Sequence, residues 1–214
     1  MLLFGHAGIT LGAVVFIDRV VNSSHFPKFA EKKSIASSSG ASQLVPELEE
    51  SQGSRASWFN TSISRMDIRL LLVGSLLPDI IDKPAGIFFF RETFSNGRIF
   101  SHTLLFLILI TVAGFILYRR YNRTWLLPFS LGTLTHLVFD QMWRTPQTLF
   151  WPLLGLSFDR EDISNWTLNI FHVLFTEPAV YIPELVGVII LIGFAYALAR
   201  NRNLLYFIKS GRTP

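Results

Sequence analysis

The sequence predicts an all-α protein: a polytopic transmembrane helical bundle with about four to five spanning helices. Half of the 214 residues are hydrophobic and only 16% are charged, whereas about a quarter of the residues of a typical soluble domain are charged. Long uncharged runs recur along the chain, and the mean hydropathy is +0.41. Cysteine is absent, which excludes disulfides, thiolate zinc sites and cysteine nucleophiles.

Five apolar segments approach the roughly 20 residues that a helix needs to cross a bilayer. In chain order they are Leu3–Val21, Ile68–Phe90, Ile99–Tyr118, Trp125–Trp143 and about Pro183–Ala199. The first lacks the basic start and the cleavage site of a signal peptide, so we expect it to be retained as a helix. The run ISNWTLNIFHVLF, between the fourth and fifth segments, is expected to form an amphipathic helix at the membrane interface.

We expect one membrane-embedded domain over residues 1–214, with a flexible polar loop at about residues 23–65. The middle of this loop is rich in serine and poor in large apolar residues, which is typical of flexible segments. The chain has no basic block interleaved with aromatic residues, so no nucleic acid partner is expected. The expected partner is the lipid bilayer, and the sequence leaves the oligomeric state open.

Lysine and arginine positions indicate the orientation, because basic residues concentrate in cytoplasmic flanks. With five spans, the polar loop, the RRYNR link and the basic C-terminal tail fall on the same side. Of the 19 Lys and Arg residues, only five remain for the other side: Lys83, Arg91, Arg98, Arg144 and Arg160. The sequence therefore predicts a multi-pass protein of the cytoplasmic (inner) membrane with its N-terminus outside.

Ionisable residues in and beside the apolar segments gather at the outer ends of the expected helices. The spacings of Asp79 with Asp82 and of His136 with Asp140 place each pair on one face of a helix. Charges at membrane depth are costly unless they are paired, and a bound cation would neutralise the aspartates. The full set is His6, Asp79, Asp82, His102, His136 and Asp140, with Glu184 on the same side.

Three imidazoles and three carboxylates form a mixed nitrogen and oxygen ligand set that suits a divalent metal ion. Zinc is the first expectation, with manganese or iron as alternatives and one or two ions per chain. Such ions activate water and hold a substrate oxygen. Asp79 and Asp140 are the candidate general bases, and Arg98 and Arg144 are candidates for binding a phosphate group of the substrate.

The motifs that carry these residues resemble those of the YdjM-like family of membrane-bound metal-dependent hydrolases, the LexA-regulated inner-membrane family. They are His6, GSLLPDIIDKP, RIFSHTLL and GTLTHLVFDQMWRTPQTLFWPLLG. The resemblance covers the helical body and leaves out the serine-rich loop and the basic tail. It implies that the six His and Asp residues above are the metal ligands. The family pattern is LPDxD, whereas two residues separate Asp79 from Asp82 in this chain.

We therefore expect an enzyme, a membrane-embedded hydrolase that uses metal-activated water on an ester or phosphoester. The substrate would be lipid-like or amphipathic, and the site would open toward the extracytoplasmic face. Two alternatives remain open. A transporter or ion path would need polar residues continuing through the membrane, and a non-enzymatic scaffold would hold a structural metal in a closed shell.

Overall fold

The computed structural model describes residues 2–23, 66–160, 162–163 and 165–212, so the loop predicted at about residues 23–65 lies almost entirely outside the described residues. The described residues form helices and no strand, which confirms the all-α prediction. The chain divides into two compact units, residues 1–13 with 66–214 and residues 14–65. All of the candidate site residues lie in the first unit.

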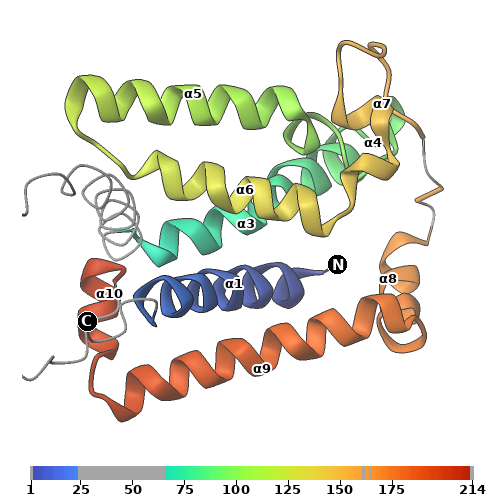
Figure 1. The fold of residues 1–214 in the computed structure, drawn as a ribbon. Coiled ribbons are helices and arrows are strands. Elements are labelled where there is room, and N and C mark those ends of the chain that lie inside the picture. The colour runs from blue at the N-terminus through green and yellow to red at the C-terminus, as the bar shows by residue number, and fades with distance from the viewer. Residues whose placement is uncertain (1, 24–65, 161, 164, 213–214) are drawn as a thin grey trace, which may run out of the picture. The chain divides into compact units, whose positions relative to one another are not determined.

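The main helices are α1, α3, α5, α6, α8, α9 and α10, joined by short helical turns (Figure 1). Helix α6 packs against both α3 and α5. The bounds of the main helices are α1 Leu3–Ser23, α3 Ile68–Lys83, α5 Leu104–Tyr121, α6 Leu126–Phe139, α8 Trp166–Thr176, α9 Pro178–Arg200 and α10 Leu204–Ser210. The turns are a π-helical Pro84–Phe89, α4 Arg91–Phe94, 3-10 turns Phe100–His102 and Met142–Arg144, and α7 Pro146–Leu149.

Two of the described helices, α5 and α9, are long and apolar enough to cross a membrane, while Leu3–Ile17 and α6 are shorter apolar helices. The large side chains of α5 and α9 point mostly outward, whereas the imidazoles of His6, His102 and His136 are fully buried. This arrangement is the one expected where lipid surrounds the bundle. The segment predicted as one span at Ile68–Phe90 divides at Lys83, where α3 gives way to the π-helical turn.

Several helix bounds differ from those that hydropathy predicts. Helix α5 begins at Leu104 rather than Ile99, because the Thr103 hydroxyl caps it by accepting the Phe106 amide at 3.1 Å. His102 therefore lies in the turn before the helix. Helix α9 begins at Pro178, five residues before the predicted start. A helix, α8, forms within ISNWTLNIFHVLF as predicted, and its place at the membrane interface stays a prediction.

Helices α3 and α6 cross in direct backbone contact at Gly74 and Gly132. A Cβ atom on Gly132 would overlap the Leu71 carbonyl, and one on Gly74 would overlap Phe129 backbone atoms. Pro78 has no N–H to donate to the Gly74 carbonyl, and the Thr133 hydroxyl lies 3.3 Å from that oxygen. The crossing thus lets α6 side chains reach the backbone carbonyls of α3.

A second glycine contact joins α9 to the first turns of α1. A Cβ atom on Gly8 would overlap the Gly187 backbone, and one on Gly187 would overlap the Phe4 carbonyl. Beside this contact, the buried Glu184 carboxylate accepts the Leu2 amide at 2.6 Å and the Phe4 amide at 2.9 Å. These are two of the amides that the start of a helix leaves without an intrahelical partner.

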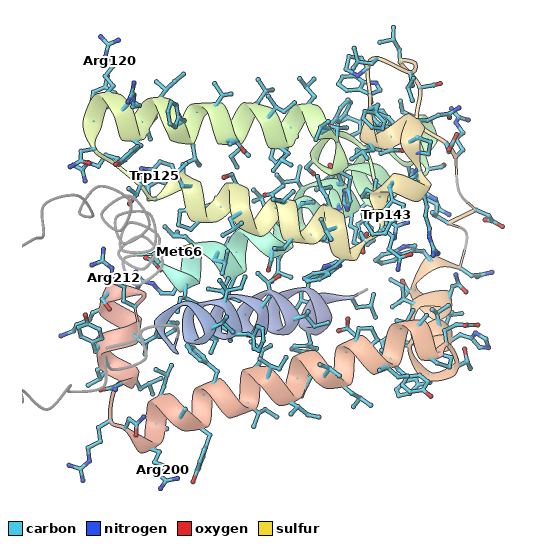
Figure 2. All side chains as sticks on the ribbon, in the orientation of Figure 1. Met66, Arg120, Trp125, Trp143, Arg200 and Arg212 are labelled. Carbon is cyan, nitrogen blue, oxygen red and sulfur yellow. The ribbon has the colours of Figure 1, made fainter. Side chains whose placement is uncertain are left out.

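The end of the bundle opposite the candidate site carries basic residues. Figure 2 shows Arg120, Arg200 and Arg212 at the end of the bundle opposite Trp143. At this end Asp67 caps α3, accepting the Arg69 amide at 3.0 Å and the Arg69 guanidinium at 2.7 Å. The hydrogen bond with Arg69 lowers the pKa of the Asp67 carboxyl below its ordinary value. The clustering agrees with the predicted basic side, whose cytoplasmic assignment stays a prediction.

Candidate metal centre

Four separate stretches of the chain bring histidine and aspartate side chains together at one end of the bundle. Helix α1 supplies one imidazole, α3 two carboxylates, the turn before α5 a second imidazole, and the end of α6 an imidazole and a carboxylate. The sequence predicted this convergence. In chain order the residues are His6, Asp79 and Asp82, His102, and His136 with Asp140.

Two of the imidazoles have their ring orientation fixed through Nδ1. His136 Nδ1 lies 2.7 Å from the Ser75 carbonyl oxygen, and His102 Nδ1 lies 2.7 Å from Asp82 Oδ2. Both oxygens only accept hydrogen bonds, so each Nδ1 is the donor and each neutral ring carries its lone pair on Nε2. Orientation through the other ring nitrogen is the usual arrangement of a metal-binding histidine.

The two Nε2 atoms face each other, 3.2 Å apart. Neutral imidazoles fixed in this way would bring two lone pairs together, which is unfavourable unless a cation or a proton lies between them. Two nitrogens bound to one tetrahedral zinc ion at about 2.05 Å each would be roughly 3.3 Å apart. The observed spacing therefore fits two ligands of a single ion.

Asp79 places one oxygen beside both imidazoles. Its Oδ1 lies 3.6 Å from His102 Nε2 and 3.9 Å from His136 Nε2. Its Oδ2 accepts a hydrogen bond from Lys83 Nζ at 2.7 Å. The lysine thus fixes the carboxylate with Oδ1 toward the histidines, and Asp79, His102 and His136 form one group that could hold a metal ion.

His6 and Asp140 form the other side of the cluster. His6 Nε2 lies 3.0 Å from Asp140 Oδ1, and the His6 ring stacks on His136 with centroids 4.1 Å apart. Buried His6 Nδ1 has no hydrogen-bond partner among the described residues. His6, His136 and Asp140 form a second group that could hold a metal ion, so His136 is shared between the two.

Asp82 lies behind His102 and belongs to neither group. It is fully buried, and its carboxylate accepts the amides of Ile99, Ser101 and His102 at 2.8–3.2 Å in addition to His102 Nδ1. These bonds use both oxygens. These contacts suit Asp82 to orienting His102, and the ligand role that the family pattern implied stays a prediction.

The other predicted residues are divided between the site and its surroundings. Arg98 lies at the site, with Nε 3.0 Å from Asp140 Oδ2. Arg144 is exposed, and no described contact joins its side chain to the cluster. Glu184 caps α1 and reaches no imidazole in the described contacts.

Two supporting groups were missed at the sequence level. Lys83 pairs with Asp79, a contact that their i, i+4 spacing would have indicated. The carbonyl of Ser75 leaves no sequence signal, because any residue type supplies one. Its role depends on the close approach of α6 at Gly132.

The fold and this cluster define a class, that of helical membrane proteins with a buried histidine and aspartate centre. Residues 35–208 match the family described as YdjM inner membrane protein. This match covers most of the chain, so the chain belongs to that family and is an inner membrane protein. No curated protein and no solved structure matches the chain.

The matched range corrects the extent of the resemblance noted above. It includes the serine-rich segment and most of the basic tail, which were expected to lie outside. It begins after α1, so His6 joins the centre on geometry alone. The group of Asp79, His102 and His136 lies wholly within the match.

Proposed function

We propose that the protein is a membrane-embedded, metal-dependent hydrolase of an ester or phosphoester. The observation that carries this proposal is the pair of Nε2 atoms 3.2 Å apart. Both rings have Nδ1 committed to an acceptor, so a cation accounts for the contact. A protonated His102 is the competing explanation, and the metal measurement below separates the two.

His102, His136 and Asp79 would hold the metal ion, with zinc, manganese and iron all compatible with this ligand set. His136 offers only Nε2 and can therefore bind one ion, so a second ion would take its protein ligands from His6 and Asp140. When bound, such ions act as Lewis acids and lower the pKa of water to near neutrality.

The protein side chains then have separate tasks. Asp140 is the better placed general base, because it borders an open cleft. Asp79 Oδ1 is directed at two imidazoles and suits a ligand. Arg98 stands beside Asp140 at the cleft, where a guanidinium can bind an anionic substrate group.

An ion path receives less support from the same residues. The buried ionisable side chains of the described residues are His6, Asp82, His102, His136 and Glu184, all at one end of the bundle. Further along the helices, the buried groups are hydroxyls such as Thr133 and Ser130, which bond to backbone carbonyls. A translocation path would need ionisable groups beyond this end.

The proposal is tested by metal content per chain of the detergent-purified protein. Wild type is compared with Asp79→Ala, His136→Ala and the control His172→Ala, which removes an exposed histidine of α8. We expect near-stoichiometric metal in wild type and in the control, and none in the two site variants. Absence of bound metal after chelator-free purification, even when metal is added back, would overturn the hydrolase proposal.

Catalysis is tested on the same preparations with a chromogenic phosphodiester and a chromogenic ester in mixed micelles. Hydrolysis should be abolished by chelation and restored by the native metal. Asp140→Asn should lower the rate at least 100-fold while the ion at Asp79, His102 and His136 stays bound, as expected for loss of a general base. Bound metal with no hydrolysis of either substrate would favour the structural-metal alternative.

A further inference from the structure

A cleft opens beside the metal centre and continues along α8. It is seen as two adjoining hollows of about 160 and about 230 Å³. Enclosed ligand pockets are commonly about 300–1,000 Å³, so the cleft suits only part of a large ligand. The residues that line both hollows are Leu2, Arg98, Trp166 and Ile170.

One end of the cleft is polar and reaches the centre. Lys83, Arg98 and Asp140 line the first hollow. The Arg98 and Asp140 side chains join at 3.0 Å, and Lys83 holds Asp79. An anion that enters this end meets two cations next to the candidate ligands.

The other end is apolar and is walled by α8. Trp166, Ile170 and Val173 line it, and their i, i+4, i+7 spacing places them on one helical face. The residues Leu168, Phe171 and Phe175 are 71%, 58% and 78% exposed. Helix α8 is therefore apolar toward the cleft and also away from it. In an inner membrane protein, such an outward face contacts lipid.

The charges of the centre favour an anionic ligand. Asp79, Asp82 and Asp140 contribute three negative charges against the positive charges of Lys83 and Arg98, and neutral imidazoles add none. The net charge of these groups is thus −1, and one divalent ion changes it to +1. A phosphodiester, with its single negative charge, would balance it.

We propose that the cleft binds a membrane phospholipid. Its phosphodiester lies at Arg98 and Lys83, and the start of one acyl chain lies along Ile170 and Val173, while the rest of the lipid stays in the bilayer. This inference rests on the proposed function and adds the substrate class and the route of access. A soluble phosphoester would leave the apolar half of the cleft without a ligand.

The test uses the full chain in phosphatidylcholine nanodiscs that contain a trace of phosphatidylglycerol with a diazirine on its acyl chain. After irradiation, mass spectrometry locates the labelled residues. We expect labelling at Ile170 and Val173 that excess unlabelled phosphatidylglycerol reduces at least five-fold and that glycerol phosphate leaves unchanged. Competition by glycerol phosphate would instead indicate a soluble phosphoester and overturn the lipid proposal.

A matched pair of variants separates the cleft from general lipid contact. Ile170→Trp fills the cleft, whereas Leu168→Trp adds the same side chain on the outward face of α8. We expect labelling of Val173 to fall at least five-fold in Ile170→Trp and to stay unchanged in Leu168→Trp. Equal labelling in the two variants, at the level of the lipid-facing Val112 of α5, would overturn the proposal.

The polar end is tested with Arg98→Gln, for which we expect at least three-fold weaker competition by phosphatidylglycerol. Unchanged competition would contradict the headgroup position. Metal content is measured on each preparation, so the two proposals can fail separately. Retained metal without specific labelling would overturn only the lipid proposal. Specific labelling without metal would overturn only the proposal of a metal-dependent hydrolase.

Discussion

The two glycine crossings of the bundle have similar geometry but different consequences. At the α3–α6 crossing, close approach lets His136 and Thr133 reach the carbonyls of Ser75 and Gly74. At the α1–α9 crossing, it places the amides of α1 against the carboxylate of Glu184. The first crossing orients a candidate metal ligand, whereas the second positions the first turns of α1.

Comparing the two crossings divides the centre into two parts, the group of Asp79, His102 and His136 and the side formed by His6 and Asp140. The α3–α6 crossing and the group of Asp79, His102 and His136 lie within the family match. The α1–α9 crossing brings in His6 from outside it. We therefore expect the first crossing to control metal binding, and the second to control the His6 and Asp140 side of the centre.

The largest effect is expected at Gly132. The change Gly132→Val should destabilise the bundle by about 3 kcal/mol, because the helices must separate to admit a branched side chain, and bound metal should be lost. Thermal unfolding in detergent and metal analysis measure both quantities.

Two further glycine variants complete this comparison. Gly8→Ala should destabilise the protein while the group of Asp79, His102 and His136 keeps its metal. Gly193→Ala, where no atom lies within 4 Å of the added Cβ, should change neither quantity. Equal metal loss in the Gly132 and Gly8 variants would refute the division into two parts.

The next largest effect is expected at Asp82. The change Asp82→Asn removes the charge that orients His102 and should weaken metal affinity about 10–100-fold, as is typical of groups behind a ligand. Competition with a chelator of known affinity measures this. Complete loss, equal to that of Asp79→Ala, would show that Asp82 is itself a ligand.

A smaller effect on metal is expected at His6. The change His6→Ala should remove no more than one of two ions, because Asp79, His102 and His136 remain intact. Metal per chain should fall by half if two ions are bound, and stay unchanged if one is. Loss of all metal would show that His6 is also needed for the ion at Asp79, His102 and His136.

The smallest effect is expected at Asp67, at the other end of α3. The change Asp67→Ala should cost about 1 kcal/mol, the usual value of a helix cap, and leave the metal in place. Asn is nearly as good a cap as Asp, so Asp67→Asn should cost less.

The pH dependence at Asp67 follows from its pKa, which is lower in the folded than in the unfolded protein. Its contribution is therefore present above the ordinary Asp pKa of 3.8 and is lost as the pH falls through the folded value. Urea titrations between about pH 2 and pH 5 should show this dependence for wild type and not for Asp67→Ala.

The sequence predicted which residues meet but not what each one does. Consecutive spanning helices run in opposite directions, so their order decides which end of the bundle each residue lies near. This order placed His6, Asp79, His102 and His136 at the same end. The role of Asp82 depends on the rotation of α3 and on the turn at Ile99–His102, which hydropathy does not encode. The helix breaks at Lys83 and Thr103 were missed, since both lie inside apolar runs.

Glu184 also sets an order of events during synthesis. Its partner amides at Leu2 and Phe4 precede it by 182 and 180 residues. Chains are made from the N-terminus, and their parts begin to fold as they emerge. The ribosome has therefore translated α3, α5 and α6 before α1 can find its counterpart. The amides of Leu2 and Phe4 therefore gain this acceptor only after that part of α9 has been translated.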